Sequence, residues 1–157
     1  MAFSQDAFFS DTYVKMMRQT ITVDPGNTTP GLFKGALWLG DAVTPLFSQT
    51  NPAYGTAPWD SGEPTGSPGY TTGGEDLTVI AFAELGGSAN KVGWRFESIL
   101  WAAATVEADG LLVYAPSLSG RAFAFRWFGQ SYDSSNGDFE LNWHADGMTR
   151  FALRQAA

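Results

Sequence analysis

Hydrophobic and polar residues alternate with a period of two along much of this chain. The clearest example covers residues 138–144, where Phe139, Leu141 and Trp143 alternate with Asp138, Glu140, Asn142 and His144. Successive side chains of a strand point to opposite faces, so this pattern predicts a strand with one packed face and one solvated face. Asn136-Gly137 lies directly upstream and predicts a hairpin turn, because both residues tolerate a positive φ.

Similar segments recur over the second half of the chain. The predicted strands cover residues 32–39, 77–85, 91–98, 105–115, 121–128, 139–143 and 148–153, with a possible short strand at 20–23. Turn-forming residues separate them at 86–90 and 116–120, and residues 99–101 are interpreted as an apolar link. Several strands at this spacing predict an all-β fold, mainly an antiparallel β-sandwich or barrel.

The N-terminal segment has a helical pattern instead. Residues 4–17 are predicted to form a short helix with Ser4 as N-cap and Asp6 in the first turn. Its apolar stripe consists of Phe8, Phe9, Tyr13, Met16 and Met17. This stripe docks either on the chain's own sheet or on a neighbouring subunit. We therefore divide the chain into an N-terminal helix and arm, residues 1–30, and an antiparallel β domain, residues 31–157.

Residues 40–76 form a long Pro/Gly-rich excursion within the β domain. Prolines lie at positions 45, 52, 58, 64 and 68, and proline disfavours both helices and central strands. The segment also carries the aromatic residues Phe47, Tyr54, Trp59 and Tyr70, which disordered linkers rarely contain. We expect an ordered excursion that lies on a protein surface, either its own or a partner's. Its glycine-rich end lacks the lysine of a phosphate-binding loop and predicts a positive φ at Gly73 or Gly74 before a strand.

Composition narrows the functional classes. Charged residues make up 16% of the 157 residues and aromatic residues 15%, whereas soluble domains usually contain about 25% charged residues. Few charges and many rings indicate either a surface partly covered by neighbouring proteins or an isolated domain that is rich in aromatic residues. The net charge of −7 and the scattered basic residues argue against nucleic-acid binding. No apolar run approaches the ~18 residues that span a membrane, and we expect synthesis in a cytoplasm without a classical export signal.

Candidate chemistry is sparse. The chain has no cysteine, which excludes disulfides, thiolate ligands and cysteine nucleophiles. His144 is the only histidine; a metal site with Asp146 or a hydrolase triad would have to be built around it, and no Gly-x-Ser-x-Gly motif is present. We therefore predict no catalytic, metal-binding or cofactor-binding residues, and a protein that is not an enzyme. Trp59, Tyr54 and Tyr70 leave open a carbohydrate-binding module in which sugars stack on exposed rings.

Several segments together resemble a known family. They are Phe33-Lys34-Gly35-Ala36-Leu37, Gly69-Tyr70-Thr71-Thr72-Gly73-Gly74, residues 99–106, residues 111–114, and residues 136–143 followed by Asp146-Gly147-Met148. The most specific parts are the Gly-Tyr-Thr-x-Gly-Gly loop and the closing Phe-x-x-x-Trp-x-x-x-Gly spacing. Over roughly residues 30–153 the chain resembles a family of small structural proteins of tailed bacteriophages.

The resemblance implies a β-rich component of the virion, assembled in the bacterial host cytoplasm, without enzymatic activity or cofactor. Its expected role is a capsid decoration or minor capsid protein that binds the major capsid protein and other copies of itself in a multi-copy assembly. A tail or head-to-tail joining protein is the alternative. The residues expected at the partner interface are Phe3, Phe8, Phe9, Tyr13, Phe47, Tyr54, Trp59 and Tyr70. We also expect that removal of residues 1–18 leaves the sheet folded and weakens assembly.

Overall fold

The computed structural model describes residues 7–39, 47–85, 91–144 and 147–152. Its elements in chain order are β1 (Ala7–Phe8), α1 (Ser10–Met17), β2 (Phe33–Trp38), β3 (Glu75–Leu77), β4 (Val79–Glu84), β5 (Lys91–Phe96), β6 (Ile99–Ala115), the 3-10 helix η1 (Pro116–Leu118), β7 (Arg121–Leu141) and β8 (Thr149–Ala152). All strand pairs are antiparallel. The prediction of an all-β antiparallel fold with a short N-terminal helix is confirmed.

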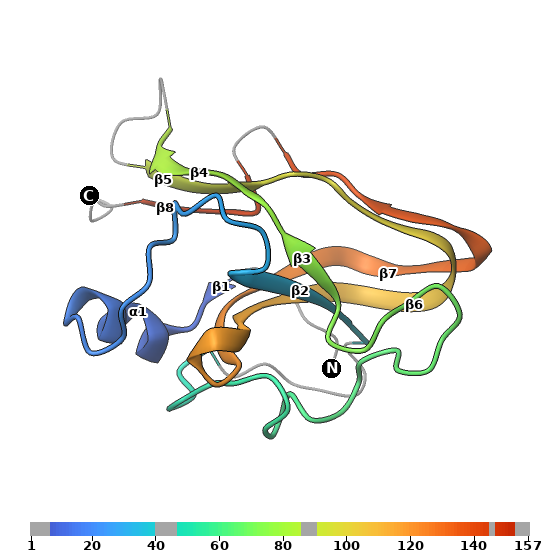
Figure 1. The fold of residues 1–157 in the computed structure, drawn as a ribbon, viewed down its shortest axis with the longest axis horizontal. Helices are drawn as coiled ribbons and strands as arrows, with labels where there is room; N and C mark the ends of the chain where they lie inside the picture. The colour runs from blue at the N-terminus through green and yellow to red at the C-terminus, as the bar shows by residue number, and fades with distance from the viewer. Residues whose placement is uncertain (1–6, 40–46, 86–90, 145–146, 153–157) are drawn as a thin grey trace.

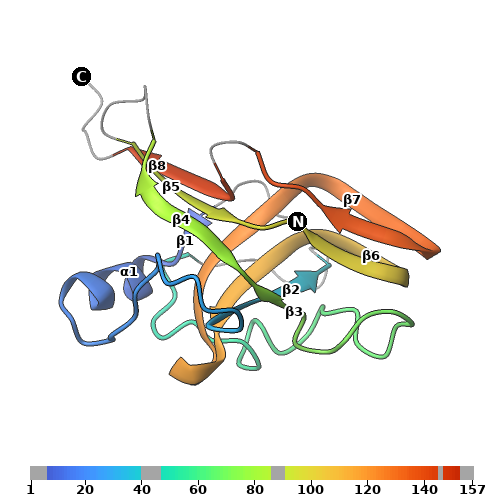
Figure 2. The same ribbon diagram turned by 45° about the horizontal axis from the view of Figure 1, so that its top comes forward.

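The strands form two layers. One sheet is five-stranded with the order β1-β7-β6-β2-β3, and the other is three-stranded with the order β4-β5-β8. At one side the chain passes between the layers from β3 to β4 (Figure 1). At the other side the long β6–β7 hairpin folds over, so that its base continues the layer of β5 and β8 while its tip lies in the five-stranded layer. Figure 2 shows the same two layers after rotation.

Irregular pairing gives the β6–β7 hairpin its bend. Ala108 pairs with Tyr132 and Gly110 with Trp127, so a single residue of β6, Asp109, lies opposite residues 128–131 of β7. Extra residues on one strand of a pair bend it and increase its twist. Asn136 has a φ of 51° at another irregularity, and Gly137 pairs with Ala104. Asn136-Gly137 therefore lies within a continuous strand, and the predicted hairpin at this position is wrong.

The first core fills the space between the two layers. Trp94 is its centre: the ring is fully buried, and its centroid lies 4.9 Å from both the Phe33 and the Phe96 ring centroids. The Trp94 indole donates to the carbonyl of Pro25 at 2.9 Å, which fastens the segment before β2 to this core. Phe139 at 8% exposure and the half-buried Leu141 and Trp143 also face this core, as their alternation predicts.

A second core covers the outer face of the five-stranded sheet. Leu111 and Val113 of β6 face the first core, whereas Leu112 and Tyr114 face the second. The strand is therefore apolar on both faces, as expected for a strand between two packed layers. The excursion supplies the cover: residues 47–74 run across this face below β2 and β6 in Figure 1, and Trp59 is fully buried against it. The prediction that the excursion is ordered is confirmed for residues 47–74. The surface on which it lies belongs to this chain and not to a partner. Residues 40–46 lie outside the described part.

Two glycines permit close approaches that no side chain allows. A Cβ on Gly110 would lie 2.1 Å from the Phe125 ring, and one on Gly74 would lie 1.9 Å from the Gly35 carbonyl oxygen. Gly73 and Gly74 have φ values of 93° and 71°, which confirms the predicted positive φ before a strand. The end of the excursion therefore lies directly on β2.

The N-terminal segment is part of this architecture. The predicted helix is shorter than expected: α1 begins at Ser10 with Phe9 as its N-cap, while the predicted cap Ser4 lies outside the described residues. Phe9 is fully buried in the second core, and the Thr12 hydroxyl donates to the carbonyl of Ala122 at 2.7 Å. Truncation of residues 1–18 would remove these contacts, so the expectation that the sheet survives it is revised.

An ion-pair cluster holds the helix to the start of β7. The Asp11 carboxylate accepts from Lys15 at 2.9 Å, from the Arg121 guanidinium at 3.1 Å and from the backbone N–H of Asn51 at 2.9 Å. Hydrogen bonding from Lys15 lowers the pKa of Asp11. The cluster joins three segments that are distant in sequence: the helix, the excursion and β7.

Several other boundaries differ from the predictions. Residues 20–23 form a bend followed by irregular chain instead of a strand. Residues 99–101 open β6 instead of linking two strands, and the segments predicted at 121–128 and 139–143 belong to one strand up to Leu141. The segment 77–85 divides into β3 and β4 at Thr78, where the chain changes layer. In β6 and β7, long-range pairing overrides a local turn or link signal.

Candidate binding surfaces

The rings predicted to contact a partner lie mostly inside the chain. Phe9 and Trp59 are fully buried and Tyr70 is 7% exposed, so the prediction of these three as partner contacts is corrected. Phe8 is half-buried and stacks on Trp94 with centroids 5.7 Å apart. The others are Tyr13, Phe47 and Tyr54, which are half-buried, and Phe3, which lies outside the described residues. Sugar stacking on Trp59 is not possible in this packing, because its ring contacts Phe9, Trp38 and Phe125 instead of solvent.

A single carboxylate fixes the excursion on the sheet. Glu63 accepts from the Tyr54 and Tyr70 hydroxyls, each at 2.7 Å, and from the backbone N–H of Gly73 at 2.6 Å. The Tyr114 hydroxyl donates to the carbonyl of Gly73 at 2.7 Å. Burial is the main cause that raises the pKa of all three tyrosines, that of Tyr114 to about 12. Hydrogen bonds of this kind to a charged acceptor are strong, so the cluster is a structural lock.

The outer face of the other layer carries no such cover among the described residues. We call it the bare face; it comprises the exposed residues Arg95, Glu97, Leu100, Ala102, Glu140 and Asn142. Leu100 is 54% exposed and pairs across the strands with Glu140. Ile80, 52% exposed, lies at the irregularity in β4 at the other side of this layer. The bare face thus combines mixed charges with isolated exposed apolar side chains.

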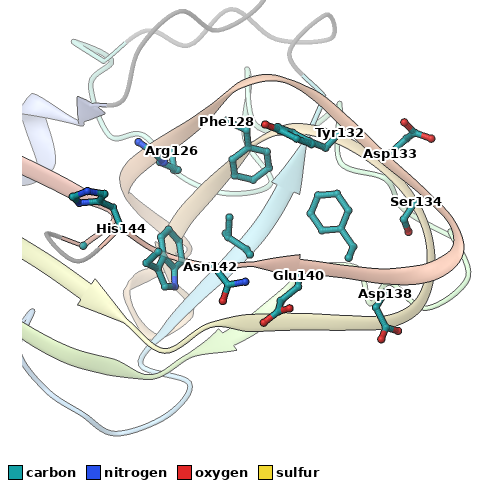
Figure 3. A pocket seen from close by; sticks show the side chains of 13 residues that line it. Arg126, Phe128, Tyr132, Asp133, Ser134, Asp138, Glu140, Asn142 and His144 are labelled. Carbon is teal, nitrogen blue, oxygen red and sulfur yellow. The ribbon is translucent and has the colours of Figure 1, made fainter.

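A groove borders the bare face where β7 folds back on itself (Figure 3). It encloses about 480 Å³ and lies between two stretches of the chain, residues 126–134 and 138–144, with Gly147 at one end. The ring of Phe128 lies inside the bend, whereas Asp138, Glu140 and Asn142 project away from it; Phe139 also lines the groove. The groove therefore has an apolar interior and a polar border.

The interior of the groove is held by ring contacts. Phe128 lies 6.3 Å from Tyr132 and 6.5 Å from Phe139, measured between centroids, and Tyr132 is 46% exposed. At the other end Trp143 packs on Phe96 at 5.7 Å and donates its indole N–H to the carbonyl of Glu97 at 2.8 Å. These contacts fix the walls, so the groove is preformed.

Other chemistry is limited in the described part of the structure. Within it, no group of three or more His, Cys, Asp and Glu residues is placed to hold a metal ion. His144 borders the groove, and its candidate partner Asp146 lies outside the described residues. The described helices include none that is long and apolar enough to cross a bilayer.

Sequence reasoning missed the residues that define both surfaces. Leu100 lies in the predicted apolar link, although its position between the buried Ile99 and Trp101 places it on the solvated face of a strand. Parity along the strand was therefore a usable signal. Glu63 had no comparable signal, because its tyrosine partners meet it only after the excursion has folded onto the sheet.

The chain was compared with known protein families, curated proteins and solved structures. No family model matches the chain, and neither a curated protein nor a solved structure matches it.

Proposed function

We propose that this chain is a non-enzymatic structural protein that binds other protein chains, and that its setting is the particle of a tailed bacteriophage. Within that setting, the role we favour is a capsid decoration or minor capsid protein, bound to the shell and present in many copies. The phage setting is supported by the resemblance over residues 30–153. The binding role is supported by the surfaces of the chain itself.

The bare face is the observation that carries the proposal. Its partner layer is covered by the excursion, which uses most of the aromatic residues of residues 47–74 for internal packing. Leu100, near the start of β6, remains more than half exposed, and Ile80 on β4 is similarly exposed. Apolar residues on a flat, mixed-charge surface are typical of the centre and rim of protein interfaces.

A repetitive shell suits such a surface. A standard interface buries about 800 Å² on each partner, and repeated copies add avidity without new contacts. A preformed sheet face loses little conformational freedom on binding, which lowers the cost of association. A moderate affinity at each site is then sufficient for stable coverage of a particle.

Electron microscopy of particles that lack this chain tests the proposal. A decoration role predicts complete heads that heat or salt breaks more readily than wild-type heads. Particles complemented with the Leu100→Asp variant should resemble the deletion, whereas the matched substitution Thr105→Asp, at another exposed β6 position, should restore stability. Headless or tailless particles would contradict decoration and indicate the joining or tail role.

A further inference from the structure

One edge of the bare face is a strand edge that no described strand covers. Leu141 pairs with Ile99 and Phe139 with Trp101 on the inner side of β7. The described strands include none that pairs with the outer side of residues 138–141, because β1 pairs with β7 only at Ala124 and Phe125. Residues 138–144, which contain this edge, also line the groove. An exposed strand edge presents backbone donors and acceptors that another chain can use.

The exposure pattern of this edge restricts the register in which a partner strand can pair with it. Side chains alternate between exposed and packed from Asp138 to His144. In an antiparallel pair, directly opposite residues point to the same face, so a shift of one residue would place packed side chains against solvated ones. Only registers that match packed with packed positions are compatible with a continuous layer.

We propose that a second copy of this chain pairs with this edge antiparallel, about a two-fold axis at Leu141, so that residues 138–144 of the two copies lie opposite each other. Leu141 then meets Leu141, and Phe139 meets Trp143 on the packed face. On the solvated face Glu140 meets Asn142, and Asp138 meets His144. The occupant of the groove edge is thus the chain itself.

The opposed side chains in this register are chemically complementary. The Asn142 carbonyl oxygen already accepts from the Ser98 hydroxyl at 2.8 Å, which leaves the amide N–H groups as donors for the Glu140 carboxylate of the second copy. Asp138 uses one oxygen for the backbone N–H of Ala103 at 3.1 Å, which holds the carboxylate in place opposite the imidazole. Aromatic and polar pairs opposite each other stabilise antiparallel strands.

The neighbouring registers are less favourable. An axis at Glu140 would place two carboxylates directly opposite each other, and like charges in this position are destabilising. An axis at Asn142 would shorten the matched segment, because Asp138 and Phe139 would then lie opposite residues beyond His144. The axis at Leu141 is the one that matches all positions of the alternating segment.

Pairing in this register would also close the groove. The layer that contains β5 and β8 in one copy would join the same layer of the second copy into one sheet across the two-fold axis. Phe139, Leu141 and Trp143 of both copies would meet at the open side of the sandwich, where the groove now exposes its apolar interior. A closed, isologous contact of this kind ends at two copies and does not propagate into a fibre.

Site-directed cross-linking tests the register, and the chain is suited to it because it contains no cysteine. Glu140→Cys and Asn142→Cys place thiols at exposed positions that the register brings together. A mixture of the two purified variants should form the mixed disulfide at least about tenfold faster than a mixture of Glu97→Cys with Asn142→Cys, since proximity raises the effective concentration of the second thiol. Glu97 is the matched control, an exposed glutamate on the same face away from the edge.

Each other outcome of that experiment contradicts the proposal. Preferential homodimers of Glu140→Cys would place the axis at residue 140, and those of Asn142→Cys would place it at residue 142. The edge does not pair with itself if the mixed disulfide forms equally fast in the test and control mixtures and analytical ultracentrifugation finds a monomer at the same concentration.

A second experiment tests the two-fold axis directly, because a residue on that axis contacts the same residue of the second copy. Leu141→Lys and Leu141→Glu should each weaken self-association at least about tenfold through like-charge contact, and an equimolar mixture should recover it. Circular dichroism of each variant checks the fold, because Leu141 also packs on the first core. Failure of the mixture to associate when both variants are folded would overturn the two-fold contact.

This inference deepens the proposed function, because it assigns one of the copy-to-copy contacts that a multi-copy assembly needs. The two can fail separately. Cross-linking uses the purified chain alone, whereas the shell-binding proposal is tested on particles. A dimer without particle binding would leave the self-pairing intact and reject the capsid role.

Discussion

The two outer faces of this sandwich are built from similar strands but end in different states. The five-stranded sheet carries Leu112, Tyr114 and Phe125 on its outer face, and the excursion covers them with Trp59. The other layer carries Arg95, Glu97 and Leu100 on its outer face, and they remain exposed. The covered face thus became a second hydrophobic core, while the bare face is available to a partner.

The comparison shows that apolar content decides which face needs a cover. Burial contributes roughly 25 cal/mol per Å² of apolar area, so a face with several large rings favours the ordering of a long loop over it. A face with a single Leu among charged residues offers too little apolar area to offset that loss of chain entropy. The aromatic-rich composition is therefore explained largely by internal packing on the covered face.

Deletion of residues 1–18 should have the largest effect on the covered face. It removes β1, α1 and the buried Phe9 ring, and loss of one such ring alone costs about 3–5 kcal/mol. We expect the truncated chain to be unfolded or to lose most of its stability in urea titrations followed by near-ultraviolet circular dichroism. A truncated chain with native tertiary signals would show that the sheet is independent of the N-terminal segment.

Trp59→Ala should be the most damaging single substitution on the covered face. Its ring packs on Trp38 and Phe125 with centroids 5.4 Å away in both cases, so truncation leaves a cavity that costs about 3–5 kcal/mol. Leu100→Ala is the matched change on the bare face and should alter the free energy of unfolding by about 0.5 kcal/mol or less. Similar losses for the two variants, measured by urea unfolding, would remove the distinction between the faces.

Glu63→Gln should have an intermediate effect. The amide is neutral and offers one acceptor oxygen in place of two. Tyr54, Tyr70 and Gly73 therefore all lose a charged acceptor and at least one of them loses its acceptor oxygen, at a cost of about 1–3 kcal/mol. The exposed Glu97→Gln on the bare face is the control and should be nearly neutral. Hydrogen exchange should show faster exchange of the Gly73 amide in Glu63→Gln, and unchanged protection would contradict the lock.

Alkaline pH should loosen the covered face selectively. Burial raises the pKa of Tyr114 from 10.0 to about 12 and also raises those of Tyr54 and Tyr70, so the folded state favours the protonated phenols. Their contribution to stability is therefore complete below pH 10 and is lost as the pH rises from 10 toward 12.

Urea unfolding across this range measures the effect. Tyr54→Phe should flatten the decline relative to the wild type. Equal slopes for the wild type and Tyr54→Phe would show that the buried phenols do not govern alkaline stability.

Ile80→Ser should have the smallest effect on folding and still reduce binding. Its side chain is 52% exposed, so the free energy of unfolding should change by about 0.5 kcal/mol or less. Binding of the purified variant to shells that lack the chain should weaken if the bare face is the contact, and Thr105→Ser serves as the matched control. Unchanged shell binding for both Ile80→Ser and Leu100→Asp would move the contact away from this face.

The fold class was predictable because its signal is local. Alternation in residues 138–144 and in the other strands follows from the geometry of a strand, and the burial of Phe139 beside the exposed Asp138 and Glu140 confirms it. The positive φ at Gly73 and Gly74 was likewise predictable from residue type. At Asn136-Gly137 the expected positive φ is present at Asn136, but the hairpin predicted from it is wrong. A positive φ occurs both in hairpin turns and in bulges within a long strand.

The sequence alone therefore determined that this chain forms antiparallel strands, where many of them lie, and that its excursion is ordered. Only the tertiary structure decided which surface the excursion covers, that Phe9 and Trp59 pack internally, and that Leu100 and the edge beside Leu141 remain accessible. The physical reason is distance along the chain: periodicity reports which side chains share a face, whereas cover and exposure depend on contacts such as those between Glu63, Tyr70 and Tyr114, which exist only once remote segments have packed together.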